Sequence, residues 1–224
     1  MLVEHIRKMK EATDKPWGIN VPLLYPEIDR LMDIIIQEGV KIVFTSAGSP
    51  KKWTPLLKSH GITVVHVVSS ALFAKKCEEV GVDAIVAEGF EAGGHNGREE
   101  TTTLTLIPNV AASCSLPVIA AGGISSGKSV AAAMTLGAEG VQIGTRFAVA
   151  AESSAHPAFK QRVFDTDEGG TMLALKKLAP TRLIKNEFFN QVKALEDAGA
   201  ETAQLTELLG KGRAKKGIFE GDMT

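Results

Sequence analysis

The chain has 224 residues, with 25 basic and 26 acidic side chains and a net charge of −1. This balance gives no attraction for nucleic acid or for an anionic membrane surface, and no apolar stretch reaches the roughly 18–20 residues of a membrane span. The two cysteines, Cys77 and Cys114, form no metal or redox motif, and no two histidines have metal-ligand spacing. We therefore expect a cytoplasmic globular protein without metal, nucleic-acid or membrane partners.

Continuous apolar segments, with little alternation of polar and apolar residues, predict six strands. In chain order they are Trp17–Val21, Lys41–Thr45, Thr63–Val68, Ala84–Glu88, Val118–Ala121 and Gly140–Thr145. Strands of this kind belong to a parallel sheet that other elements cover. Helical patterns lie between them, over residues 26–37 and over residues 71–80 with Ser70 as the N-cap. Glycines at positions 39, 61, 81 and 137 separate a helix from the next strand.

Small and polar residues follow the strands, which is typical of a (β/α) barrel whose site lies at the carboxyl edge of its strands. A barrel closes with eight strands, and the sequence begins inside a helical pattern. The prediction is therefore an α/β fold, a (β/α)8 TIM barrel that lacks its first two βα units in this sequence. A doubly wound open sheet is the alternative, because six strands suffice for it.

The pattern changes near residue 183. We expect a partial barrel domain over residues 1–182, and a C-terminal helical segment and tail over residues 183–224. A long polar helix is predicted between Leu183 and Leu209.

The most informative motif is Glu88-Gly89-Phe90-Glu91-Ala92-Gly93-Gly94-His95-Asn96-Gly97, directly after the strand that ends at Glu88. Its glycines let the backbone approach a ligand closely, and a histidine held there is suited to acid–base work. Packing does not explain His95 between Gly94 and Gly97, so a catalytic role is favoured. For His66, inside a strand, an interior hydrogen-bonded role and a place in the site are equally supported. Glu88 or Glu91 could contact a cofactor.

Two further strand ends carry glycine-rich turns. Residues 117–129 contain Gly122 and Gly123, whose amides at a helix start suit a phosphate. The same segment matches the phosphate-loop pattern G-x-x-x-x-G-K-S, but no later strand ends in an aspartate that could hold Mg²⁺, which disfavours a nucleotide triphosphatase. The segment Gln142-Ile143-Gly144-Thr145 ends the next strand, and its amides could hold a second side of the same phosphate. Together the two turns favour a phosphate-bearing cofactor.

These three motifs, in this order, resemble the nitronate monooxygenase (2-nitropropane dioxygenase) family, of which flavin-dependent enoyl-ACP reductase II is a close relative. The resemblance covers residues 3–160 and implies an FMN-binding (β/α)8 barrel. It implies His95 as the catalytic histidine. The implied FMN contacts are Asn20, Glu88, Gly93, Gly94, Gly122, Gly123, Gln142, Ile143, Gly144 and Thr145. Relatives often have glutamine where this chain has Glu88.

The resemblance implies an FMN-dependent oxidoreductase that oxidises alkyl nitronates or nitroalkanes with O₂ to carbonyl compounds and nitrite. A homodimer is a possible oligomeric state. The alternative is enoyl-ACP reductase II, in which NAD(P)H and FMN reduce an enoyl thioester. A third hypothesis is a non-catalytic flavin- or nucleotide-binding remnant.

Overall fold

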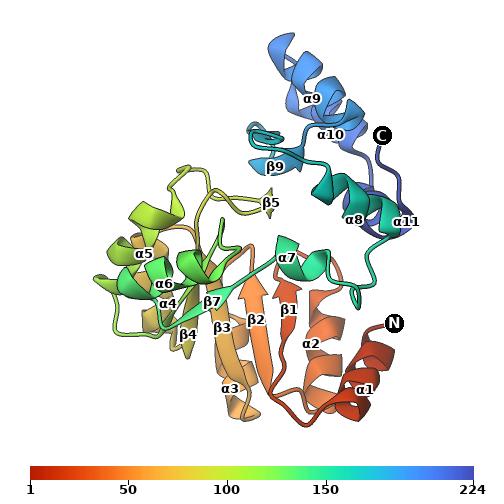
Figure 1. Cartoon of the computed structure of the whole chain (residues 1–224). Helices are drawn as coiled ribbons and strands as arrows, with labels where there is room; N and C mark the ends of the chain where they lie inside the picture. The colour runs from red at the N-terminus through yellow and green to blue at the C-terminus, as the bar shows by residue number, and fades with distance from the viewer.

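The computed structural model describes all 224 residues and contains a six-stranded parallel sheet (Figure 1). The strands lie in the order β1 (Ile19–Pro22), β2 (Ile42–Ser46), β3 (Thr63–Val68), β4 (Ala84–Glu88), β6 (Val118–Ala121) and β7 (Gly140–Gln142). This order follows the chain, whereas a doubly wound sheet reverses direction at a switch point. The α/β fold with a barrel-type sheet is therefore confirmed, and β1 and β7 lie at its two edges.

Helices connect the parallel strands. They are α2 (Ile28–Gln37), α3 (Trp53–Ser59), α4 (Ala71–Val80), α5 (Thr103–Ala111) and α6 (Gly127–Thr135), and α1 (Leu2–Ala12) precedes the first strand. The predicted helix over residues 71–80 is confirmed, and the Ser70 side chain accepts a hydrogen bond from the Phe73 amide as its N-cap. All four junction glycines have positive φ. Because every crossover has this form, the carboxyl ends of all six strands meet at one edge of the sheet.

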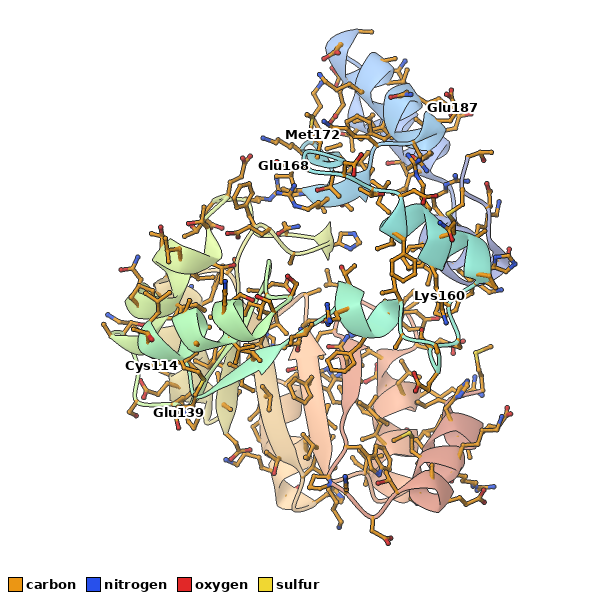
Figure 2. The ribbon with its side chains drawn as sticks, viewed as in Figure 1. Cys114, Glu139, Lys160, Glu168, Met172 and Glu187 are labelled. Carbon is orange, nitrogen blue, oxygen red and sulfur yellow. The ribbon has the colours of Figure 1, made fainter.

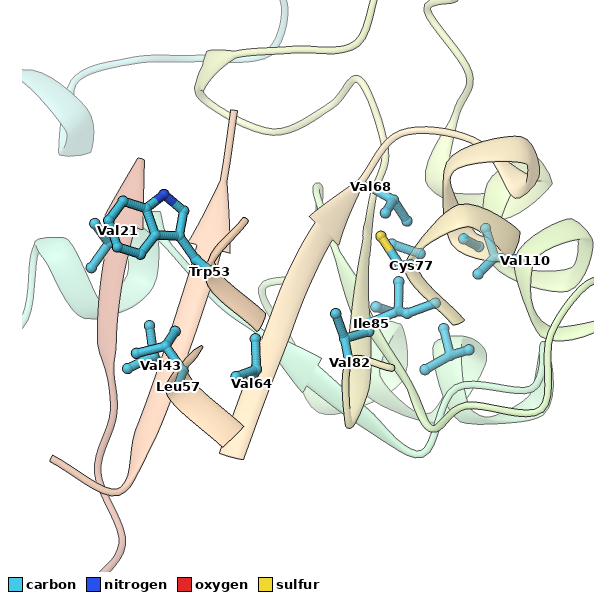
Figure 3. Packing of buried hydrophobic residues seen from close by; sticks show 14 of the residues in the cluster. Val21, Val43, Trp53, Leu57, Val64, Val68, Cys77, Val82, Ile85 and Val110 are labelled. Atoms are coloured by element: carbon cyan, nitrogen blue, oxygen red, sulfur yellow. The ribbon is translucent and has the colours of Figure 1, made fainter. Parts of the chain in front are cut away.

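The absence of alternation in the strands is explained by burial on both faces of the sheet. The helix-covered face holds the main core, where Val43, Val64 and Ile85 pack against Leu57 of α3 and Cys77 of α4 (Figure 3). The opposite face forms a smaller cluster with Val65, Val86 and Ala121 at its centre. Burying each large aliphatic side chain stabilises the fold by about 1.5–3 kcal/mol, so both faces favour apolar residues.

The C-terminal part adds a hairpin and four helices. Strands β8 (Thr171–Ala174) and β9 (Thr181–Ile184) form a three-stranded sheet with the short β5 (Gly94–His95), in the order β5-β9-β8. The helices are α8 (Pro157–Phe164), α9 (Glu187–Asp197), α10 (Thr202–Leu209) and α11 (Arg213–Glu220). Lys160 of α8, labelled in Figure 2, donates to the carbonyls of Ala150 and Ser153, which joins α8 to the segment after α7 (Thr145–Ala148).

Two sequence predictions beyond residue 139 are wrong in detail. The long helix over residues 183–209 is two helices, because Gly199 adopts a left-handed φ of 78° between them and Leu183 belongs to β9. The last parallel strand ends at Gln142 rather than Thr145, because Gly144 is already the N-cap of α7.

The division at residue 183 stays a prediction. The second hydrophobic cluster, from Ala174 to Leu205, includes residues on both sides of that point. No helix combines the length and apolarity needed to cross a bilayer.

Candidate functional site

A cavity of about 830 Å³ lies at the carboxyl edge of the parallel sheet, within the size range of small-molecule and cofactor sites. Four of the predicted site residues line it, and they come from four different strands: Asn20, Glu88, His95 and Gln142. Cα pairing explains part of this grouping, since Glu88 is opposite Ala121 and Ala121 is opposite Gln142. The fold therefore brings together residues that are up to 122 positions apart, from 20 to 142.

His95 is presented to this cavity by the loop after β4, residues 88–97. Its side chain is exposed, and β5 holds its backbone against β9 through the pairs Gly94 with Arg182 and His95 with Thr181. Asn96 stabilises the turn, because its side-chain amide donates to the carbonyls of Ala92 at 2.9 Å and of Gly94 at 3.0 Å. An ordered loop with an exposed imidazole is suited to proton transfer with a bound substrate.

Besides Cys77, where burial raises the pKa of the thiol from 9.0 to about 11, two ionisable groups in the cavity have strongly shifted pKa values. Glu88 is half-buried, and this burial raises the pKa of its carboxyl group from 4.5 to about 7. His66 is buried, and burial lowers the pKa of its imidazole from 6.5 to about 4, while the Gly48 backbone opposes the shift. The hydroxyl of Thr45 lies 2.7 Å from Nδ1 of His66. His66 therefore stays neutral near pH 7, whereas Glu88 can exchange a proton there.

These shifts predict opposing pH effects on stability. The contribution of Glu88 is present below pH 4.5 and is lost as the pH rises through about 7. The contribution of His66 is present above pH 6.5 and is lost as the pH falls through about 4. Glu88→Gln removes the first effect. As the pH rises from 4.5 to about 7, the free energy of unfolding of this variant should therefore rise by about 2–3 kcal/mol relative to that of the parent. Urea unfolding at several pH values measures it, and parallel profiles for variant and parent would contradict it.

Glu91 has a structural partner rather than a place in the cavity. Its carboxylate accepts from the amide of Thr103 at 2.9 Å and from the Thr103 hydroxyl at 3.0 Å. The same hydroxyl oxygen also lies 2.9 Å from the carbonyl oxygen of Gly122, so its single proton is shared between these two acceptors. A Cβ on Gly89 would lie 2.1 Å from this hydroxyl oxygen. The loops after β4 and β6 and the start of α5 are thus in contact, and no side chain fits at residue 89.

The predicted phosphate-binding residues lie on adjacent strand ends, and of these only Gln142 lines the cavity. Gly122 and Gly123 follow β6, while Ile143, Gly144 and Thr145 follow β7. The amides of Gly123 and Gly144 donate to no acceptor within the chain, so both can bind an anion. Gly93 and Gly94 are exposed in the His95 loop. A ligand with one part that fills the cavity and a phosphate that lies beside the ends of β6 and β7 fits this arrangement. FMN consists of such parts, a flavin ring and a phosphate.

The phosphate-loop alternative is weakened by the hydrogen bonds around α6. The Ser129 hydroxyl accepts from the amides of Ser125 at 3.1 Å and Ser126 at 3.0 Å. These amides and this hydroxyl would have to be free to bind phosphate and Mg²⁺ in such a loop. No cluster of three histidine, cysteine or acidic side chains could hold a metal ion.

Sequence reasoning missed several residues that line the cavity. Asn96 is the clearest, because its Oδ1 is buried without a hydrogen-bond partner. Its position beside His95 was the available signal. Phe73 and Lys76 of α4 also line the cavity, and a helical pattern contains no information about which exposed positions border a site.

Comparison with known proteins agrees with these features. A family pattern described as nitronate monooxygenase matches residues 26–223. A probable nitronate monooxygenase of Bacillus subtilis is 36% identical over 179 residues, which cover 71% of this chain and 52% of that protein. The (3aS,4S,5R,7aS)-5-hydroxy-7a-methyl-1-oxo-octahydro-1H-indene-4-carboxyl-CoA dehydrogenase of Mycobacterium tuberculosis is 32% identical over 197 residues, covering 86% of this chain and 55% of that protein.

Among solved structures, FabK from Thermotoga maritima is 39% identical, with a TM-score of 0.93 over 99% of this chain and 70% of that chain. The chain spans just over half the length of the two curated relatives. The family match extends over nearly the whole chain, and the chain belongs to the nitronate monooxygenase family.

Proposed function

We propose that the chain is an FMN-dependent oxidoreductase that oxidises alkyl nitronates or nitroalkanes with O₂ to carbonyl compounds and nitrite. The observation that carries the proposal is the exposed His95 at a cavity that Asn20, Glu88 and Gln142 also line. The relatives named as probable nitronate monooxygenases support the choice of reaction. The cytoplasmic location and the homodimer stay predictions.

The residues of the chain would divide the work as follows. His95 would take the proton from the carbon next to the nitro group, or hold the anionic nitronate by a hydrogen bond. Asn20, Glu88, Gly93 and Gly94 would border the flavin ring. The phosphate would lie at Gly122, Gly123 and the run from Gln142 to Thr145. FMN, when bound, supplies the electron chemistry, while the protein orients the substrate and handles the proton.

The second candidate is the reduction of an enoyl thioester with NAD(P)H. Two observations favour it. One relative is named as a dehydrogenase of a carboxyl-CoA compound, which is a thioester. In addition, Glu88 has a pKa of about 7 and lines the cavity, so it could deliver the proton that the α carbon of an enoyl thioester needs when hydride enters at the β carbon.

One set of measurements separates the candidates. The purified protein, after addition of FMN, should show flavin absorbance and take up O₂ with an alkyl nitronate. Consumption of NAD(P)H that depends on a crotonyl thioester, without nitronate-dependent O₂ uptake, would replace the first proposal with the second. Protein that neither contains nor takes up FMN would contradict both and support a non-catalytic remnant.

A further inference from the structure

The β8–β9 hairpin contacts the loop that presents His95, although the two segments are far apart in the sequence. Figure 1 shows β5 lying between the carboxyl edge of the sheet and β9. Besides the β5–β9 pairing, the amide of Asn96 donates to the carbonyl of Pro180 at 2.8 Å. Arg98, just beyond the loop, donates to the carbonyl of Leu178 at 3.1 Å. The hairpin thus contacts the loop on both sides of His95.

Arg182 of β9 adds several side-chain contacts to this pairing. Its Nε and Nη2 donate to the carbonyl oxygen of Phe90 at 3.1 and 2.9 Å, and its guanidinium lies 5.1 Å from the centre of the Phe90 ring. Nη1 donates to the hydroxyl of Thr171 on β8 at 3.3 Å. A planar guanidinium can make these contacts at once, whereas a lysine ammonium cannot match the paired geometry.

The loop is therefore held at two successive residues near its start. Glu91 connects it to Thr103 and the parallel sheet, and Phe90 connects it to Arg182 and the hairpin. Because the His95 side chain is exposed, the backbone of the loop sets where its imidazole lies. A displacement of about 1 Å at a reacting group can cost on the order of 100-fold in rate.

We propose that Arg182 is a positioning residue, which places His95 over the cavity by holding the carbonyl group and the ring of Phe90. The role in turnover rests on the proposed function of His95, while the effect on the loop does not. Arg182 need not contact substrate, because it acts through the backbone between Phe90 and His95.

The test compares Arg182→Ala and Arg182→Lys with the parent protein, both before and after FMN is added. In Arg182→Ala, amide hydrogen exchange over residues 91–97 should accelerate by roughly tenfold or more, while exchange in β3 stays unchanged. The value of kcat should fall by about 10- to 100-fold, with KM changed much less. Arg182→Lys should recover part of both effects, because a single hydrogen bond to Phe90 can remain.

Arg213→Ala is the matched control. Arg213 also lies over a phenylalanine ring, at 4.6 Å from the centre of Phe188, and pairs with Asp222 at 2.9 Å, but it has no contact with the His95 loop. Unchanged exchange over residues 91–97 in Arg182→Ala, or equal acceleration in Arg213→Ala, would overturn the proposal. Hydrogen exchange needs no turnover, so a parent protein without activity would contradict the proposed function while the effect of Arg182 on the loop is still measured.

Discussion

His95→Ala is expected to retain FMN and to lose nitroalkane turnover by about 10²–10⁴-fold, which is the usual contribution of a positioned acid or base. The reason is geometric: the His95 side chain is exposed at the cavity, and the contacts that order its loop are made by other residues, such as Asn96. Its removal should therefore leave the loop and the cavity in place. Steady-state O₂ uptake with FMN-saturated protein measures the loss, and flavin absorbance measures retention.

His5→Ala is the matched control for this change. His5 is an exposed histidine on α1 and does not line the cavity, so its replacement should leave turnover unchanged. Full activity in FMN-loaded His95→Ala would remove His95 from the mechanism. Loss of FMN together with activity would instead assign His95 to cofactor binding.

Gly89→Ala is expected to lower stability and FMN retention together. The added Cβ would lie 2.1 Å from Oγ1, 2.4 Å from N and 2.6 Å from Cα of Thr103. Two of these are backbone atoms, so rotation of the Thr103 side chain cannot relieve the overlap, and the start of α5 must move away from the loop after β4. Overpacking of this kind costs about 1–3 kcal/mol or more, which corresponds to a fall in Tm of roughly 2–12 °C for a chain of this size.

Circular dichroism during heating measures the change in Tm, and a fluorescence titration measures FMN binding. Gly127→Ala provides the control, because a Cβ at Gly127 meets no atom within 4 Å and alanine is favoured over glycine in a helix by roughly 0.5–1 kcal/mol. A Gly89→Ala protein whose Tm equals that of the parent would show that the two loops tolerate separation.

Much of the sheet was predictable because its signals are local. The strands at 63–68, 84–88 and 118–121 have the predicted bounds, since a run of apolar residues between two turns is sufficient to indicate a buried parallel strand. The candidate site was partly predictable for the same reason. Polar residues after parallel strands must meet at one edge of the sheet, and Asn20, Glu88 and Gln142 do line one cavity there.

Other features depend on contacts between distant segments. Strand β5 has two residues and gains its structure by pairing with β9, so no periodicity could reveal it. The polar pattern of residues 183–209 indicated one helix. In the structure Gly199, with its positive φ, divides this segment into two helices, which pack together through Val192 and Leu205 in one cluster. Glu91 and Glu88 looked equivalent as candidates, but one bonds Thr103 and the other lines the cavity.

The sequence by itself thus determined the parallel βα architecture, the edge at which the candidate site lies and the histidine loop. The reason is that apolar runs, glycines and the residues at strand ends are signals that extend over only a few residues. Only the tertiary structure decided that Arg182 holds this loop and that the pKa of Glu88 rises to about 7. The pKa of Glu88 depends on the atoms that exclude water from its carboxyl group, and the contact of Arg182 joins groups that are roughly 90 residues apart in the chain. Such a desolvation cost or hydrogen bond exists only once the chain has folded.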